Sequence, residues 1–551
     1  MKSDYLIPFL LLFIVLTVRS SAQMEPRLAV VNAKIITMDE KNPKADAMVI
    51  EGERIIYVGN SDQAQKICGP QCWILDLSGL AVVPGFNDSH THTVEGGMRL
   101  LQPNLYGKSC EEIVKIIAEE VKKSKPGRYI LGHDWDFGFC PNPDRRALDQ
   151  VSKDNPVMLS QYGGHSLWVN SYLLDKLGIS ADSKDPAGGK IDRDQKGKPT
   201  GILRETAAEP AYVRSLFSIP MAQRRKGISK ALELYRRAGI TSVQDNSWDP
   251  RTIWALGEFK EQGKLTCRFT CWSLGERWYA PAMLRFANYY PGWVRRGPAK
   301  IYADGSFSTK TAWMTKPYPG EPDNFGIPRH TQAELNRHIL NAAQTGQQVA
   351  VHAIGDRAVQ STLDAIELAE KQYPKAKKLR FRLEHIQMVR PEDFPRFQKL
   401  GVLASVQPFA LGDPEKDLRL LGKERAKQAY PYRSLMTAGA SISFGSDFPA
   451  ELDFEPLLGI YYAVNRKSKT GKPGPLNPDE RLTVQQALWA YTMGGAYAEF
   501  MEKEKGSLEP GKLADFAVLS KSPLEVNPEK IKDIEVRYTF VGGKQVWPEV
   551  K

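Results

Sequence analysis

The sequence has little histidine, little cysteine and no long apolar run beyond its N-terminal segment. Only eight histidines occur in 551 residues, so any close pair of them needs an explanation. No later stretch approaches the roughly 20 apolar residues that cross a bilayer. Internal repeats and low-complexity segments are also lacking. These absences exclude a multi-span membrane protein and a solenoid, and they leave a large globular protein.

The charge balance does not indicate a nucleic-acid partner. The formal net charge is +11, but Lys and Arg are interleaved with Asp and Glu along most of the chain. The densest basic clusters, 122–125 and 224–226, are typical of solvated helix faces. Since no basic stripe is interleaved with aromatic residues, we expect no nucleic acid among the partners.

A short apolar run, Leu6–Val18, stands near the N-terminus and is followed by small residues that end at Ala22. Thirteen residues are too few to span a bilayer, so we expect residues 1–22 to be a signal peptide cleaved after Ala22. The protein would then enter the secretory pathway, either to the endoplasmic reticulum lumen or for secretion. The alternative is an uncleaved signal anchor, because Arg19 follows the run directly. Membrane contact would then be confined to this segment.

Six cysteines suit an oxidising compartment, but the sequence does not fix their pairing. Free buried thiols are an equal alternative. Neither Cys-x3-Cys pair predicts a zinc site, because no further Cys or His lies nearby at a suitable spacing.

Both ends of the chain are rich in predicted β-strands, and the long middle alternates between strands and helices. Residues 47–58 read as two strands joined by a glycine turn, and Phe516–Leu519 and Val536–Val541 have the same character. We therefore expect a small β-sandwich domain built from residues 24–84 plus 500–551. The alternation between these ends predicts an α/β fold, a TIM-like (β/α)8 barrel over residues 85–499 with an insertion near 96–200.

The most informative motif ends in two histidines one residue apart. His90 and His92 close the apolar run that begins at Val83. Because residues i and i+2 of a strand point to the same face, both imidazoles can reach one metal ion. A purely structural pair is the alternative.

Three further metal-compatible side chains follow apolar strands: His352, His385 and Asp447. Each of them alone could be an ordinary polar residue at a strand end. In α/β barrels, however, the carboxyl ends of the strands meet at the active site. Imidazole and carboxylate ligands suit Zn²⁺ or a similar divalent ion that keeps a position open for water. Such an ion would supply hydroxide at neutral pH, and Asp447 could carry the proton to a leaving nitrogen.

Taken together, these motifs resemble those of the amidohydrolase superfamily, in particular its amidohydrolase-3 branch with N-substituted formamide deformylase-like proteins. The matching segments are Val83–His92, Lys300–Ser306, His352–Asp356, Leu383–His385, Phe444–Pro449 and Gly506–Phe516. The resemblance covers nearly everything after residue 24. It implies a metallo-hydrolase barrel in which the last of these segments leads back to the sheet domain.

The resemblance also implies roles for individual residues. His90 and His92 would bind one metal ion, His352 and His385 a second, and Asp447 would be both ligand and proton shuttle. Many members bridge the two ions with a carboxylated lysine, and Lys300 stands where that residue is expected. A carbamate would turn a repelling ammonium into a metal-binding anion.

Alternatives remain for the residues beyond the histidine and aspartate ligands. If Lys300 is unmodified, or is a solvent-facing strand residue, a one-metal site becomes the better model. We expect His165, Asp304 and Trp135 to contact the substrate, but each also has a structural interpretation. Asp304, for example, precedes a glycine and would equally suit a turn.

The implied function is that of a metal-dependent hydrolase of non-peptide carbon–nitrogen bonds, with a small-molecule amide, formamide or cyclic amide as substrate. Deaminase members of the superfamily carry a glutamate three residues after the fifth-strand histidine, where this chain has Gly355. Amide hydrolysis is therefore favoured over deamination of a nucleobase.

The motifs are also similar to those of plant long-after-far-red-type amidohydrolase-like proteins. A non-catalytic, regulatory role in light signalling is therefore the alternative. The complete set of expected ligands favours an enzyme. Nothing in the sequence specifies the oligomeric state.

Overall fold

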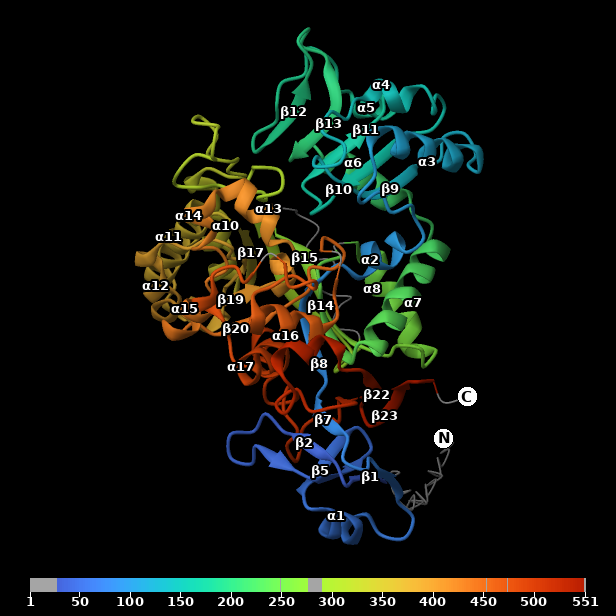
Figure 1. Cartoon of the computed structure of the whole chain (residues 1–551), viewed down its shortest axis with the longest axis vertical. Helices are drawn as coiled ribbons and strands as arrows, with labels where there is room; N and C mark the ends of the chain where they lie inside the picture. Colours follow the sequence, from blue (N-terminus) through green and yellow to red (C-terminus); the bar gives the residue numbers. More distant parts are fainter. Residues whose placement is uncertain (1–26, 248, 276–289, 452, 473, 550–551) are drawn as a thin grey trace, which may run out of the picture.

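The computed structural model describes residues 27–247, 249–275, 290–451, 453–472 and 474–549. The expected signal peptide therefore lies outside the described residues. Figure 1 shows a β-rich part that contains both ends of the described chain, a central barrel, and an insertion at the far end of the molecule. A search of the described helices finds none that is long and apolar enough to cross a membrane.

The central part is a nearly closed barrel of parallel strands, which confirms the expected α/β fold. In the order of their pairing, the strands are β8 (Phe86–Thr91), β14 (Ile240–Asp245), β15 (Arg268–Leu274), β16 (Val294–Tyr302), β17 (Val349–Ala353), β18 (Arg382–His385), β19 (Leu403–Val406) and β20 (Ile442–Phe444). The circle closes beyond β20, where the Asp447 backbone N–H donates to the His90 carbonyl at 2.7 Å. His92 N–H donates to the Phe448 carbonyl at the same distance.

Helices cover the outside of the barrel (Figure 1), and their ends follow from the local sequence. The helix α10 (Gln332–Thr345) begins with a capping box between Thr331 and Glu334 and ends at Gly346, whose φ is 69°. It packs against α11 (Asp356–Gln372), and β17 lies between them in the chain. Every residue of β17 is buried, as expected for a parallel strand covered on both faces.

Strands from both ends of the chain form the β-rich part. One sheet has the order β23 (Lys544–Trp547), β22 (Val536–Val541), β21 (Phe516–Leu519), β7 (Ala81–Pro84), β2 (Lys34–Ile36) and β3 (Lys44–Ala45). The other has the order β5 (Arg54–Gly59), β4 (Ala47–Glu51), β1 (Arg27–Val31) and β6 (Trp73–Asp76). Val30 and Ile50 of the second sheet share an apolar core with Val82, Phe516 and Phe540 of the first.

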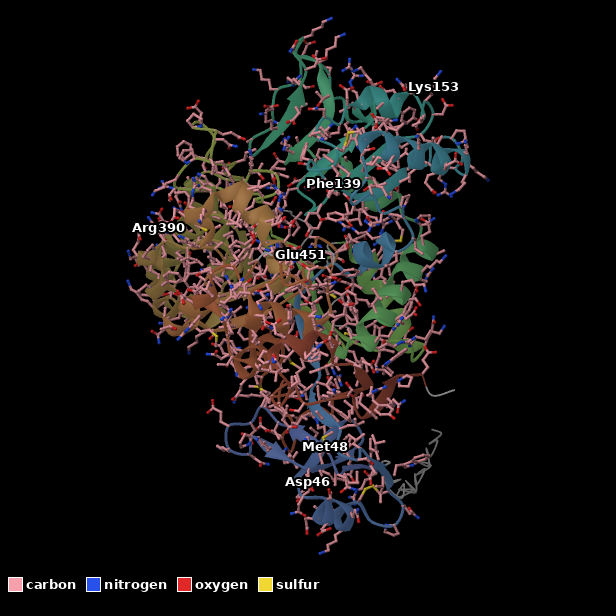
Figure 2. All side chains as sticks on the ribbon, viewed as in Figure 1. Asp46, Met48, Phe139, Lys153, Arg390 and Glu451 are labelled. Atoms are coloured by element: carbon pink, nitrogen blue, oxygen red, sulfur yellow. A yellow bond between two sulfur atoms is a disulfide. The ribbon has the colours of Figure 1, made fainter. Side chains whose placement is uncertain are left out.

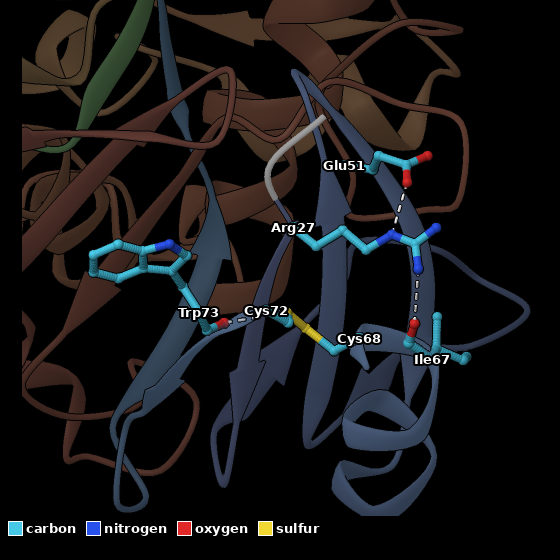
Figure 3. The surroundings of a disulfide bond; sticks show 6 residues. All are labelled: Arg27, Glu51, Ile67, Cys68, Cys72 and Trp73. Carbon is cyan, nitrogen blue, oxygen red and sulfur yellow. Dashed lines mark hydrogen bonds and ion pairs between the residues drawn. A yellow bond between two sulfur atoms is a disulfide. The ribbon is translucent and has the colours of Figure 1, made fainter. Parts of the chain in front are cut away.

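Two of the three cysteine pairs are disulfides. Cys68, at the end of α1 (Ser61–Cys68), is bonded to Cys72 just before β6 (Figure 3). Arg27 lies beside this bridge, where it donates to Glu51 and to the Ile67 carbonyl. The second disulfide, Cys110–Cys140, joins α3 (Cys110–Lys122) to a loop of the insertion. The remaining pair, Cys267 and Cys271, are buried free thiols in the described part of the chain.

The insertion lies between β8 and β14 and has its own mixed sheet. Its strands pair in the order β12 (Gly189–Arg193), β13 (Pro199–Glu205), β11 (Ser166–Val169), β10 (Val157–Gln161) and β9 (Ile130–Trp135). The helices α5 (Ser171–Leu177) and α6 (Glu209–Ser218) belong to the same segment. Leu167 and Leu203 of this sheet pack with Leu173 of α5 and Ala211 of α6. The insertion therefore contains an apolar core of its own, separate from that of the barrel.

Candidate active site

His90 and His92 meet Asp447 where β8 and β20 end. The Glu384 carboxylate accepts a hydrogen bond from His90 Nδ1 at 2.7 Å, so the proton of this imidazole resides on Nδ1. The His90 Nε2 lone pair then points to Asp447, whose Oδ1 lies 3.5 Å away. His92 Nε2 lies 3.2 Å from the same oxygen. Ligand atoms of these three residues all lie within 4.8 Å of one another.

Glu384 is itself fixed by a buried arginine. Arg382 Nε donates to Glu384 Oε1 at 2.7 Å, and neither side chain is exposed. The guanidinium also donates to the Ser89 carbonyl and to Ser405 Oγ. A carboxylate behind a histidine orients the ring and makes it a stronger metal ligand. The sequence interpretation gave no role to Arg382 or Glu384. Their role could have been suspected from the sequence, because two charged residues stand two positions apart in a strand that is buried on both faces.

His352 and His385 form the other side of the cluster. Their ring centroids are 4.3 Å apart, and the His385 ring lies 5.1 Å from that of His90. His385 Nε2 is buried and has no hydrogen-bond partner within the described ranges. The backbone is left-handed at His385 (φ 75°) and at Asp447 (φ 57°). Conformations of this kind cost about 1–3 kcal/mol each and are concentrated at functional sites.

The electrostatics of the cluster suit a divalent cation. Burial lowers the pKa of His385 to about 4 and holds the pKa of His90 and His352 well below the usual range. These imidazoles are therefore neutral at pH 7, the form in which a histidine binds metal. Burial alone would raise the pKa of Asp447, but the facing rings of His90 and His92 hold it well below its ordinary value. Neutral imidazoles around an ionised carboxylate fit Zn²⁺ or a similar ion.

Lys300, near the end of β16, is buried inside the barrel, so the solvent-facing alternative is wrong. Its Nζ lies 3.2 Å from His90 Nε2. Burial lowers the pKa of this amine to about 8. Lys300 thus lies within the cluster, and a substantial fraction of it is neutral in mildly alkaline solution.

The three expected substrate-contacting residues lie in different places. His165 is next to the cluster, since its ring lies 5.1 Å from that of His352 and its Nδ1 lies 3.0 Å from Glu205 Oε2. Asp304 instead accepts three backbone N–H groups, those of Ile354 and Gly355 just beyond β17 and that of Trp313. It is therefore a positioning residue that holds the loop after His352.

Trp135 does not reach the cluster. Its indole N–H donates to the Leu159 carbonyl at 3.0 Å, and its ring packs against Phe137 and Trp168 in the core of the insertion. The described residues that line the cavity beside the cluster do not include it. In place of the expected substrate contact, Trp135 therefore has a structural role in the core of the insertion.

A cavity of about 270 Å³ opens onto this cluster. On the barrel side its lining residues include His92, Lys300, His352, His385 and Asp447. Many of the other lining residues come from the insertion, and the lining as a whole is mainly apolar although it includes Glu205 and Glu209. The apolar and aromatic residues from the insertion include Leu131, Met158, Tyr212, Leu216 and Ile219. The cavity therefore combines a cluster of potential ligands with an apolar surface, the usual composition of a small-molecule site.

Comparison with known proteins assigns the family. Residues 74–547 match the model of the Amidohydrolase family. The chain belongs to this family. The chain is 34% identical to Protein LONG AFTER FAR-RED 3 of Arabidopsis thaliana over 95% of this chain and 91% of that protein. It is 28% identical to N-substituted formamide deformylase of Arthrobacter pascens, which covers 94% of this chain and 97% of the relative.

A solved structure described as a metal-dependent hydrolase has a similar fold. The chain superposes on an uncharacterized metal-dependent hydrolase from Pyrococcus horikoshii with a TM-score of 0.73 and 30% identity, over 91% of this chain and 99% of that one. These matches support a metal-dependent hydrolase with a TIM-like barrel, as the strand-end histidines predicted.

Proposed function

We propose that this amidohydrolase hydrolyses a non-peptide carbon–nitrogen bond in a small-molecule amide, formamide or cyclic amide. The observation that carries the proposal is the convergence of His90, His92 and Asp447 ligand atoms within 4.8 Å, at the carboxyl end of the barrel. The formamide deformylase among its relatives supports this class of bond.

The proposed cofactor is one or two divalent ions, with Zn²⁺ as the best match to the ligands. His90, His92 and Asp447 would hold the first ion, and His352 and His385 the second. The neutral amine of Lys300 would attack CO2, form an N–C bond and release a proton to give a carbamate, whose oxygens would be available as metal ligands. If Lys300 stays unmodified, the one-ion arrangement applies. When bound, such an ion polarises a carbonyl group and lowers the pKa of water.

Asp447 is the proposed proton carrier. Its ionised carboxylate would accept a proton from the attacking water and then pass it to the leaving nitrogen as the carbon–nitrogen bond breaks. His165, fixed by Glu205, would contact the substrate carbonyl. The apolar wall of the insertion would pack against the substituent of the amide and exclude bulk water.

The test is metal analysis of the purified full-length chain, followed by chelation and reconstitution on a panel of N-formyl and N-acyl amines. We expect bound metal, loss of turnover on chelation and its return with Zn²⁺. His92→Ala, which removes a ligand of the first ion in either arrangement, should remove metal and activity. The matched control His338→Ala, on the outer helix α10, should keep both. A chain that holds no metal, or metal without turnover of any panel compound, would contradict the proposal.

A regulatory protein without catalysis, with a role in light signalling, is the second candidate, and it is supported by the 34% identity to LONG AFTER FAR-RED 3, whose name refers to far-red light. It requires that the metal-loaded chain turns over none of the panel compounds. The same assay therefore separates the two candidates.

We further propose that the protein passes through the secretory pathway. The disulfides Cys68–Cys72 and Cys110–Cys140 support this location, because such bonds persist in oxidising compartments. N-terminal sequencing of the mature protein should begin at Gln23. A mature chain that retains Met1 would contradict cleavage.

A further inference from the structure

A second, smaller cavity of about 50 Å³ lies beside the metal-ligand cluster. It shares His165, His352, His385 and Asp447 with the large cavity, so these residues form a common wall. Beyond them it reaches the end of β19 and the helix α13 (Pro414–Leu421). Glu451, another of its lining residues, lies between the barrel and the insertion (Figure 2).

Gln407 is one of the residues that line this cavity. It follows β19 directly, at the carboxyl end of a barrel strand where active-site groups are placed. Its side chain is 2% exposed, yet neither Nε2 nor Oε1 has a hydrogen-bond partner among the described residues. Buried side-chain amides are almost always paired, and a carboxamide that lacks both partners presents one donor group and one acceptor to whatever occupies the cavity.

Asp417 adds a second unpaired group. Its carboxyl is fully buried, and Oδ2 accepts a hydrogen bond from Tyr430 at 3.0 Å. Oδ1 has no partner in the parts of the chain that the structure covers. Gln407 and Asp417 come from different elements, a strand end and a helix, but both line the same cavity. Two independent unsatisfied groups around one small space indicate a built binding site.

The charges around the cavity favour a neutral ligand. Lys416 lines it and stacks over the Tyr162 ring, whose hydroxyl donates to Glu451 Oε2 at 2.8 Å. One cation therefore faces the carboxyl groups of Asp417 and Glu451, while the ionised Asp447 lies on the wall shared with the metal-ligand cluster, where a bound cation would balance its charge. Burial raises the pKa of Asp417 to about 7 and that of Glu451 above its usual value, which limits the negative charge. Neither an anion nor a cation is strongly favoured in such a surrounding.

We propose that Gln407 and Asp417 form a subsite for a small neutral group that both donates and accepts hydrogen bonds, a primary carboxamide or urea group. A carboxamide can accept from Gln407 Nε2 while its own N–H groups donate to Gln407 Oε1 and Asp417 Oδ1. A space of about 50 Å³ suits such a group, but not an aromatic ring. The assignment of this group to the substrate rests on the proposed amide hydrolysis. The substrate would then be bipartite, with its apolar part against the insertion and its polar end here.

The test uses acetamide as the probe and acetone as its matched analogue, which has nearly the same shape but no N–H donor. Binding to the full-length, zinc-loaded protein would be measured by ligand-observed NMR titration, and repeated after chelation to exclude binding through the metal. We expect saturable binding of acetamide in the millimolar range in both forms, at least tenfold tighter than that of acetone.

Gln407→Met should weaken acetamide binding at least tenfold, because it keeps the volume and removes both polar atoms. Gln161→Met is the matched control. Gln161 is also a fully buried glutamine with two unpaired polar atoms among the described residues, but it does not line this cavity. If Gln407→Met fails to fold, acetamide binding is measured in Gln407→Glu instead, which keeps the size of the side chain and loses its donor group.

Equal binding of acetamide and acetone, or unchanged acetamide binding in both Gln407 variants, would overturn the subsite. Occupation by water alone would give no saturable binding and would overturn it as well. Hydrolysis of the amine panel is scored separately. Amide hydrolysis without acetamide binding refutes only the subsite, and acetamide binding without hydrolysis refutes only the proposed function.

Discussion

Replacement of Glu384 by Gln tests whether the buried carboxylate behind His90 prepares that ring for metal. Two short hydrogen bonds end on this carboxylate, from His90 Nδ1 and Arg382 Nε, both at 2.7 Å. Removal of one partner from a buried ion pair costs about 3–5 kcal/mol. Gln keeps one acceptor oxygen and the volume, so we expect a loss near ~3 kcal/mol. Loss of such a group behind a ligand also weakens metal binding about 10–100-fold.

The two effects can be separated by a matched variant. Arg268 and Asp515 form another buried ion pair, with Nε to Oδ2 at 2.7 Å, and neither residue touches the histidine cluster. Asp515→Asn should therefore lower the free energy of unfolding in urea by a similar amount. Zinc affinity, measured by competition with a chelating dye under native conditions, should change only in Glu384→Gln. If both variants bind zinc equally well, the carboxylate does not prepare His90 for metal.

Three further perturbations probe the proton carrier, a disulfide and a buried carboxyl group. Asp447→Asn, compared with the parent protein at equal zinc content, should lower kcat at least ~100-fold, and retained turnover would remove its proton role. Replacement of both Cys110 and Cys140 by Ser should lower the free energy of unfolding by about 3 kcal/mol, because the bridge closes a loop across a separation of 30 residues. An unchanged urea midpoint would contradict this. Burial raises the folded-state pKa of Asp417 to about 7, so its contribution to stability is complete below about pH 4 and is lost as the pH rises to 7. Asp417→Asn should abolish that contribution to the pH slope, up to about 1.4 kcal/mol per unit, and identical slopes in urea titrations would refute it.

The ligands at the strand ends could be predicted because both arguments use only neighbouring residues. Residues i and i+2 of a strand share a face, and the carboxyl ends of barrel strands carry the active-site groups. His90, His352 and Asp447 each follow an apolar run, and such runs become barrel strands whose carboxyl ends converge. The helices at 332–345 and 221–237 were predictable for the same reason, since the apolar periodicity of each lies within its own segment. The first of them is also marked by a capping box and a C-terminal glycine.

The parts that could not be predicted depend on contacts between distant segments. Trp135 and Asp304 both follow strand-like runs, as the ligands do, but Trp135 ends a strand of the insertion instead of the barrel. Asp304 does end a barrel strand, yet its carboxylate is used by the backbone of the next β–α loop. The environment of Gln407 likewise depends on a helix and an insertion loop that pattern analysis cannot place.

The pairing of β7 with β21 has a consequence for how the protein is made. Pro84 lies opposite Phe516, a partner about 430 residues later in the chain. At a synthesis rate of about 5–20 residues per second, β7 waits on the order of half a minute or longer for that strand to leave the ribosome. During this interval one edge of β7 has no partner strand, and its free backbone N–H and C=O groups can pair with the wrong strand. We therefore expect the chain to depend on chaperones during its synthesis. A stop codon that removes β21 to β23 should lower the solubility of the protein strongly, although few residues are lost.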